Sequence, residues 1–124
     1  MRATSRRYAS SIVARVEGRL DHDTCDPFGA QLTLWVDTAA RERGILVLDL
    51  SGLEYVSSAG LRCFMLGSRH AQANGTAIVV AALQPMVAEI FAISHFDRLF
   101  RVFPDVRAAL ADASGEALAA FDKA

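Results

Sequence analysis

The sequence predicts an α/β domain built on a mixed, mostly parallel central sheet of four to five strands with about four helices. Strand-like and helix-like segments alternate along the chain, and the runs Ile45–Leu48 and Ala77–Ala81 are continuously apolar, as in strands covered on both faces. Alternating strands and helices form parallel sheets with right-handed crossovers. One domain accounts for all 124 residues. We expect its core over about 11–113, an N-terminal arm or weak first strand at 1–8, and a helical tail at 114–124.

The first strand and first helix are predicted from the segment before Gly44. Ser11–Val16 is β-rich and is closed by Gly18, and we expect it to pair in a hairpin that makes the sheet mixed. Pro27 suits a first helical position because it has no N–H to leave unpaired. The residues before and beside it that offer helix caps are Asp23, Thr24 and Asp26. Gly44 is the expected stop signal.

The middle of the chain predicts two buried strands around a second helix. The first strand is expected over Ile45–Leu50, and the helix runs from about Ser58 to Ala73, where Asn74-Gly75 ends it. The second strand follows at Thr76–Ala81. Residues 51–58 are expected to form the loop at the carboxyl end of the first of these strands, the edge at which open α/β sheets gather their functional loops.

The last third predicts two helices and a short strand. Pro85 opens a third helix, Phe100–Phe103 reads as a strand, and Pro104-Asp105 starts a last amphipathic helix. Beyond Ser114-Gly115 the chain extends that helix, restarts it or frays.

Composition and charge argue against several function classes. The net charge of −1 provides no field that attracts nucleic acid or anionic lipid. The longest apolar run, Ala77–Leu83, is far below the roughly 20 residues that span a bilayer, and no signal peptide precedes the first strand. Cys25 and Cys63 lack metal-ligand spacing, so we expect reduced packing residues. We therefore expect a cytoplasmic protein without metal, cofactor, membrane or nucleic-acid partner.

The pair Ser57-Ser58, just before the second helix, has three interpretations. Ser57 suits an N-cap, whose hydroxyl accepts from an N–H one turn into the helix. A catalytic serine would need a positioned base, for which His22 is the only plausible histidine, and Val56 stands where a GxSxG elbow needs glycine. The third interpretation is a phosphoacceptor, because a helix N-terminus accommodates a phosphate, which carries a charge of about −1.5 to −2.

Three segments in order resemble the STAS domains of bacterial anti-sigma factor antagonists. Residues 18–24, GRLDHDT, are similar to the family's Gly-x-Leu-Asp-x-x-Thr segment. Asp49-Leu50-Ser51 with residues 55–61, YVSSAGL, is similar to its central Asp-x-Ser…Ser-x-Gly-Leu signature. Pro85–Phe91, then Phe96 and Leu99-Phe100, match the family's later helix and final strand. The resemblance covers about residues 12–110.

The resemblance implies a regulator without catalysis of its own. Ser58 would be the phosphoacceptor, with Ser57, where many members have Asp, as the alternative. The dephosphorylated protein would bind an anti-sigma factor of the histidine-kinase-like ATPase type, which is also its serine kinase, and so free a sigma factor. A serine phosphatase would restore this form. The residues expected to contact or shape the partner site are Asp21, Asp49, Ser51, Ser57, Ala59, Gly60, Leu61 and Arg62.

Two other functions remain open from the sequence. Related STAS modules serve transport or lipid-trafficking machinery, which would imply constitutive partner binding and no phosphate on Ser58. A serine hydrolase would react with a fluorophosphonate probe.

Overall fold

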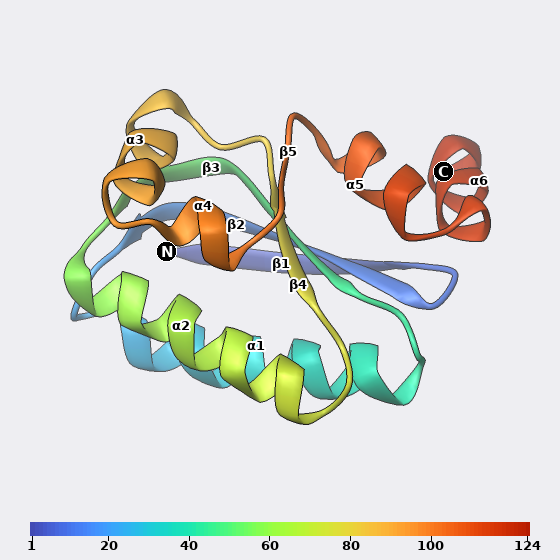
Figure 1. Cartoon of the computed structure of the whole chain (residues 1–124), viewed down its shortest axis with the longest axis horizontal. Helices are drawn as coiled ribbons and strands as arrows, with labels where there is room; N and C mark the ends of the chain where they lie inside the picture. Colours follow the sequence, from blue (N-terminus) through green and yellow to red (C-terminus); the bar gives the residue numbers. More distant parts are fainter.

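The computed structural model describes all 124 residues and confirms a mixed, mostly parallel α/β fold (Figure 1). One sheet has the strand order β1-β2-β3-β4-β5. Strand β1 is antiparallel to β2, and the other neighbours pair in parallel. The strands are β1 (Arg2–Tyr8), β2 (Ser11–Leu20), β3 (Leu46–Val56), β4 (Ile78–Ala81) and β5 (Val102–Phe103). The helices are α1 (Cys25–Arg41), α2 (Ser58–Ala73), α3 (Pro85–Ile93), α4 (Phe96–Leu99), α5 (Val106–Ala113) and α6 (Gly115–Lys123).

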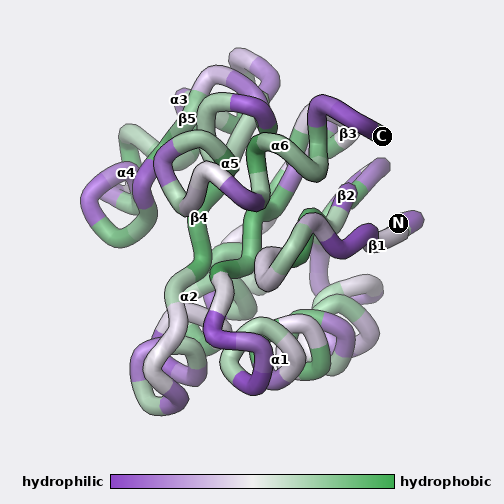
Figure 2. The backbone as a smooth tube through the Cα atoms, turned by 90° about the vertical axis from the view of Figure 1, so that its right-hand side faces the viewer, coloured by the Kyte–Doolittle hydropathy of each residue, from purple (hydrophilic) through white to green (hydrophobic).

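Helices cover both faces of the sheet. Helices α1 and α2 lie side by side on one face, and α5 with α6 lies on the other (Figure 1). The larger core packs Phe28, Leu32 and Phe64 against β2, β3 and β4. A smaller core joins Tyr8, Val47 and Leu110 on the opposite face. In Figure 2 the hydrophobic segments accordingly gather in the middle of the molecule, between the two helix layers.

The N-terminal segment is a strand and not a solvated arm. Residues Arg2–Tyr8 pair antiparallel with β2, from Arg2 opposite Glu17 to Tyr8 opposite Ser11. Arg2, Arg6 and Arg7 remain exposed on this edge strand. Tyr8 is buried and packs edge-on against Phe121 of α6, with ring centroids 5.3 Å apart. The backbone pairing and this single aromatic anchor therefore hold a strand that is otherwise hydrophilic.

Strands β2 and β3 are both longer than the sequence predicts. Gly18 does not end β2 but lies inside it at φ +94°, a backbone conformation that favours glycine, next to shifts in the β2–β3 register. Strand β3 continues past Leu50 to Val56. The expected loop at 51–58 is therefore wrong, because β3 extends to Val56, with Gly52, Leu53, Tyr55 and Val56 paired to β2, and only Ser57 separates β3 from α2.

The helix ends differ from prediction in detail. Helix α1 begins at Cys25, so Pro27 is its third residue, and the cap residue Thr24 makes no side-chain cap bond. At the other end, Arg43 and not Gly44 adopts positive φ; a Cβ at Gly44 would overlap the Ser10 carbonyl.

Six helices are present where about four are predicted. Short α4 is an addition to the predicted set. The C-terminal tail restarts as α6, because the Ser114 hydroxyl accepts from the Ala117 amide at 3.0 Å and caps a new helix.

Candidate functional site

The carboxyl ends of β2 and β3 lie together and carry the candidate site. Leu20 and Val56 are register partners at these ends, and the Ser57 amide donates to the Leu20 carbonyl at 2.9 Å. The β2–α1 turn and the β3–α2 junction therefore meet at one edge, at the left of Figure 1 and opposite the end occupied by α6. The structure thus brings Asp21 beside the Ser57-Ser58 pair, as the sequence predicts.

Ser57 is the N-cap of α2. Its hydroxyl accepts from the Gly60 amide at 3.2 Å, and its carbonyl accepts from the Leu61 amide at 2.9 Å. Its backbone is extended, at φ −85° and ψ 174°, as helix caps require. The predicted capping role is confirmed, and the Ser57 hydroxyl is committed to holding the helix start.

Ser58 is the first residue of α2, and its side chain is exposed. No hydrogen bond inside the protein engages its hydroxyl, since the cap bond belongs to Ser57. The amides of Ser58 and Ala59 are in the first turn and lack intrahelical acceptors. These amides and the positive end of the helix dipole favour a negative group at this position. The Ser58 hydroxyl can therefore accept a substituent without the loss of a structural bond.

Asp21 is held in a tight turn with Thr24. The Asp21 Oδ1 atom accepts from the Asp23 amide at 3.0 Å and from the Thr24 amide at 3.3 Å. The Thr24 hydroxyl accepts from the Asp21 amide at 2.9 Å and lies 3.3 Å from Oδ1. Desolvation works against ionisation, but these hydrogen bonds and nearby His22 outweigh it and lower the pKa of Asp21 below 3.8. A fixed negative charge therefore stands beside the serine pair.

Of the four residues after Ser58, some pack against the strands and the core, and one is exposed to solvent. Gly60 is buried, and a Cβ there would lie 2.9 Å from the Leu20 carbonyl and 3.0 Å from a Val56 methyl. Leu61 is half-buried against the larger core. Ala59 is half-buried, and Arg62 is exposed one turn after Ser58. Glycine at position 60 lets the start of α2 approach β2. The side chains of Ser58 and Arg62 are exposed to solvent.

Asp49 and Ser51 lie apart from the serine pair. Asp49 is opposite Arg15 in the sheet, and Leu20 is five positions further along β2, which is roughly 16 Å of strand. The Asp49 carboxylate accepts from the Ser51 amide at 3.0 Å. Together with Arg6, Val106 and Phe121 it also lines a cavity of about 270 Å³. This cavity is on the sheet face covered by α5 and α6. Asp49 lies within β3, as the predicted Ile45–Leu50 strand implies, but the expectation that Ser51 joins Ser58 in one loop is wrong, because β3 extends through Ser51 to Val56.

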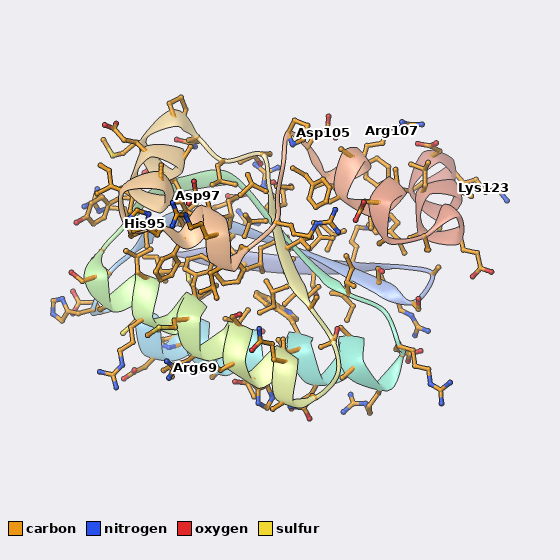
Figure 3. All side chains as sticks on the ribbon, in the orientation of Figure 1. Arg69, His95, Asp97, Asp105, Arg107 and Lys123 are labelled. Atoms are coloured by element: carbon orange, nitrogen blue, oxygen red, sulfur yellow. The ribbon has the colours of Figure 1, made fainter.

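No histidine supports a nucleophilic serine. His22 Nε2 lies 3.1 Å from Asp23 Oδ1, and both side chains are largely exposed. His70 pairs with Asp37 across α1 and α2 at 2.7 Å, and His95 stands before α4, where Figure 3 labels it near Asp97. None of them hydrogen-bonds to Ser57 or Ser58. The geometry gives neither serine the positioned base that such catalysis requires.

An arginine–tyrosine pair near this edge is missing from the sequence prediction. The Arg19 guanidinium lies 4.4 Å from the Tyr55 ring centroid, a cation–π distance. The two residues are register partners one position before Leu20 and Val56. Only the bulged β2–β3 register pairs them, and residue spacing alone contains no signal for that register.

Comparison with known proteins identifies the family. A family model described as "Mlab, STAS domain" matches residues 4–104. The chain belongs to the STAS domain family. BtrV of Bordetella bronchiseptica, a protein assigned as an anti-sigma factor antagonist, is 32% identical to this STAS domain over 111 residues, covering 90% of this chain and 93% of BtrV. The family model and this relative confirm the resemblance to STAS-domain anti-sigma factor antagonists.

Several solved structures share the fold at low sequence identity. An anti-sigma factor antagonist from Mycobacterium paratuberculosis superposes with a TM-score of 0.79 at 22% identity, covering 90% of this chain and 92% of the other. The Bacillus cell fate determinant SpoIIAA in its phosphorylated form gives 0.64 at 16%, covering 90% and 98%. The murine anion transporter Slc26a9 gives 0.74 at 19%, covering 86% of this chain but 18% of the transporter. In this STAS domain no helix combines the length and apolar character that a membrane crossing needs.

Proposed function

We propose that this STAS domain is an anti-sigma factor antagonist switched by phosphorylation of Ser58. The dephosphorylated protein binds an anti-sigma factor of the histidine-kinase-like ATPase type and so releases a sigma factor. That anti-sigma factor is also the serine kinase that modifies Ser58. A serine phosphatase returns the protein to its binding state, and the domain performs no catalysis of its own.

The exposed, unbonded hydroxyl of Ser58 carries the proposal. Ser57 supplies the cap to α2, so esterification of Ser58 removes no bond that holds the fold. Ser58 is also at the helix N-terminus, where a dianion meets free amides. The fold can therefore tolerate the phosphate. Ser57 is the weaker phosphoacceptor because its hydroxyl oxygen already accepts a hydrogen bond from the Gly60 amide.

The same phosphate would oppose docking. The surface around Ser58 contains the ionised Asp21 turn on one side and Arg62 one turn along α2. A phosphate adds about two negative charges and bulk at this surface, which would clash with a partner fitted to the bare hydroxyl. A penalty of about 3–4 kcal/mol lowers affinity several hundredfold, which one desolvated charge clash can supply.

The proposed contact residues fall into two groups. Asp21, Ala59 and Arg62 offer side-chain surface around Ser58, whereas Ser57, Gly60 and Leu61 shape the helix start. Asp49 and Ser51 act at a distance by ordering β3. The Ser51 carbonyl accepts from Gln84 Nε2 at 2.7 Å, and Gln84 is the cap residue of α3. We assign these two residues to the placement of α3 and not to partner contact.

An accessory module of a transport or lipid-trafficking system is the second candidate. The fold shared with part of the anion transporter Slc26a9 favours it. This function requires a constitutive partner and leaves Ser58 unmodified. The two candidates therefore differ in whether a kinase labels the protein.

Binding to a purified anti-sigma factor of this ATPase type from the same organism tests the proposal. We expect Ser58→Ala to bind like the unmodified protein. We expect Ser58→Asp to raise the dissociation constant at least a hundredfold while its circular dichroism stays native. Equal binding by both variants would contradict the switch. A partner protein that binds without ever phosphorylating Ser58 would favour the accessory module.

A further inference from the structure

The two cysteines of the chain meet where α1 begins beside α2. Cys25 is the first residue of α1, and Cys63 is in the second turn of α2. They are 38 positions apart in sequence, yet the Cys63 thiol donates to the Cys25 carbonyl at 3.3 Å. Adding the Cα–C and C=O bond lengths puts Cys63 Sγ no more than about 6 Å from the Cys25 Cα. A disulfide also requires the two Cα atoms to lie about 4.4–6.8 Å apart, so the link forms when α1 and α2 adjust to that spacing.

Space and access exist around both sulfurs. Both cysteines are half-buried and line a cavity of about 290 Å³ between α1 and α2, together with Gly29 and His70. Gly29 follows Cys25 by one helical turn, and even a Cβ added there would lie 4.0 Å from Cys63 Sγ. The Gly29 side of the Cys63 sulfur is therefore open, and a small oxidant can reach both sulfurs from the cavity.

The environments of the two thiols suggest an order of reaction. Burial, and then the interaction with the Cys25 thiol, raise the pKa of Cys63 to about 11. Cys63 is therefore protonated near neutral pH and attacks a peroxide slowly, because the thiolate is the reactive form. Cys25 is beside the β2–α1 turn, with its sulfur 3.4 Å from the His22 carbonyl. We assign the first step to Cys25, because burial disfavours the Cys63 thiolate, and Cys63 is then the second thiol.

We propose that Cys25 and Cys63 are a redox modification site that forms a reversible intramolecular disulfide when the protein meets a peroxide. The Cys25 sulfur attacks hydrogen peroxide; an S–O bond forms, the O–O bond breaks, and hydroxide leaves with the thiol proton as water. The Cys63 sulfur then attacks the Cys25 sulfenic acid; the S–S bond forms, the S–O bond breaks, and a second water leaves. Two thiols are oxidised by two electrons, and one peroxide is reduced to two waters.

The cross-link would join the two elements behind the candidate site. Cys63 follows Ser58 by five residues on α2, and Cys25 directly follows Thr24, which holds the Asp21 turn. A link between residues this far apart in sequence restricts the unfolded chain. Oxidation should therefore raise the unfolding temperature by several degrees.

Peroxide treatment of the native chain without reductant tests the site. Intact mass under non-reducing conditions is expected to show a monomer that has lost two hydrogen atoms. A peptide map should join the Cys25 and Cys63 peptides, and dithiothreitol should restore both thiols and the original unfolding temperature. In Cys63→Ser we expect a Cys25 sulfenic acid trapped by dimedone, and in Cys25→Ser we expect the Cys63 thiol to persist.

Three results would overturn the proposal: two free thiols after treatment, separate sulfinic acids, or disulfides formed only between chains. The map of the unmutated protein decides between these results and the proposed link even if a serine variant folds poorly.

Discussion

The Ser57 amide donates a 2.9 Å hydrogen bond to the Leu20 carbonyl, and this bond fixes the β3–α2 junction against the end of β2. It places the phosphoacceptor candidate Ser58 next to the Asp21 turn, although 37 positions separate Ser58 from Asp21 along the chain. The bond involves only main-chain atoms, so the placement depends on backbone geometry. The residues that permit this geometry are therefore the first to test.

Substitution of Ser57 tests the division of labour between the two serines. Ser57→Ala removes the acceptor of the Gly60 amide, so we expect a loss of about 1 kcal/mol in unfolding free energy, as for other N-caps. Ser57→Asp retains an acceptor and should be stable to within about 0.5 kcal/mol of the unmodified protein. Urea unfolding measures both. Ser58→Ala is the matched control, since that hydroxyl makes no internal bond; a cost equal to that of Ser57→Ala would refute the assignment of the cap.

Gly60 tests the close approach of α2 to β2. In Gly60→Ala the new methyl would lie 2.9 Å from the Leu20 carbonyl and 3.0 Å from side-chain atoms of Leu20 and Val56. Because these neighbours are core or backbone, we expect a loss of about 1–3 kcal/mol in unfolding free energy. Gly115→Ala is the control, since no atom lies within 4 Å of its added Cβ. Similar stability of both variants would contradict the close packing.

The pH dependence of the unfolding temperature tests the negative charge of Asp21 beside the site. The pKa of Asp21 is lowered below 3.8 in the folded protein, so its ionised form stabilises the fold above that pH. This contribution is lost as pH falls through the folded-state pKa. Asp21→Asn should therefore lower the unfolding temperature near pH 7, and the difference from the unmodified protein should shrink on acidification below 3.8. A difference that stays constant with pH would show that the charge has no part in it.

Arg62 tests which part of α2 faces the partner. Arg62→Ala should weaken binding to the anti-sigma factor roughly two- to fivefold, as expected for one exposed ion pair, and more at low salt. Arg69, labelled on α2 in Figure 3, follows Arg62 by seven residues and is also exposed. Arg69→Ala is therefore the control at the far end of the same helix. Equal effects of the two substitutions would place the contact elsewhere.

The features that the sequence predicts correctly are mostly encoded by residues close together in the chain. Helix α2 runs from Ser58 to Ala73 as expected, because a serine cap and an Asn-Gly stop are both encoded within a few residues. The capping role of Ser57 follows from the same local chemistry. The meeting of Asp21 with Ser58 also follows, because both are at carboxyl ends of neighbouring parallel strands.

Long-range pairing explains what the sequence does not predict. Ser51, Gly52 and Glu54 interrupt the apolar run and look like a loop. They nevertheless belong to β3, because β2 pairs with Gly52, Leu53 and Tyr55 around two register shifts. Arg2–Tyr8 lacks an apolar pattern and becomes a strand through its hairpin with β2. The contact between Cys25 and Cys63 depends on how α1 and α2 pack, which no spacing along the chain encodes.

The most direct test is to phosphorylate the protein with its anti-sigma kinase, locate the phosphate by peptide mass mapping, and measure kinase affinity before and after. We predict one phosphate on Ser58, retained in Ser57→Asp and absent in Ser58→Ala, together with at least a hundredfold loss of affinity. A phosphate on another residue, or unchanged binding once Ser58 carries it, would contradict the account.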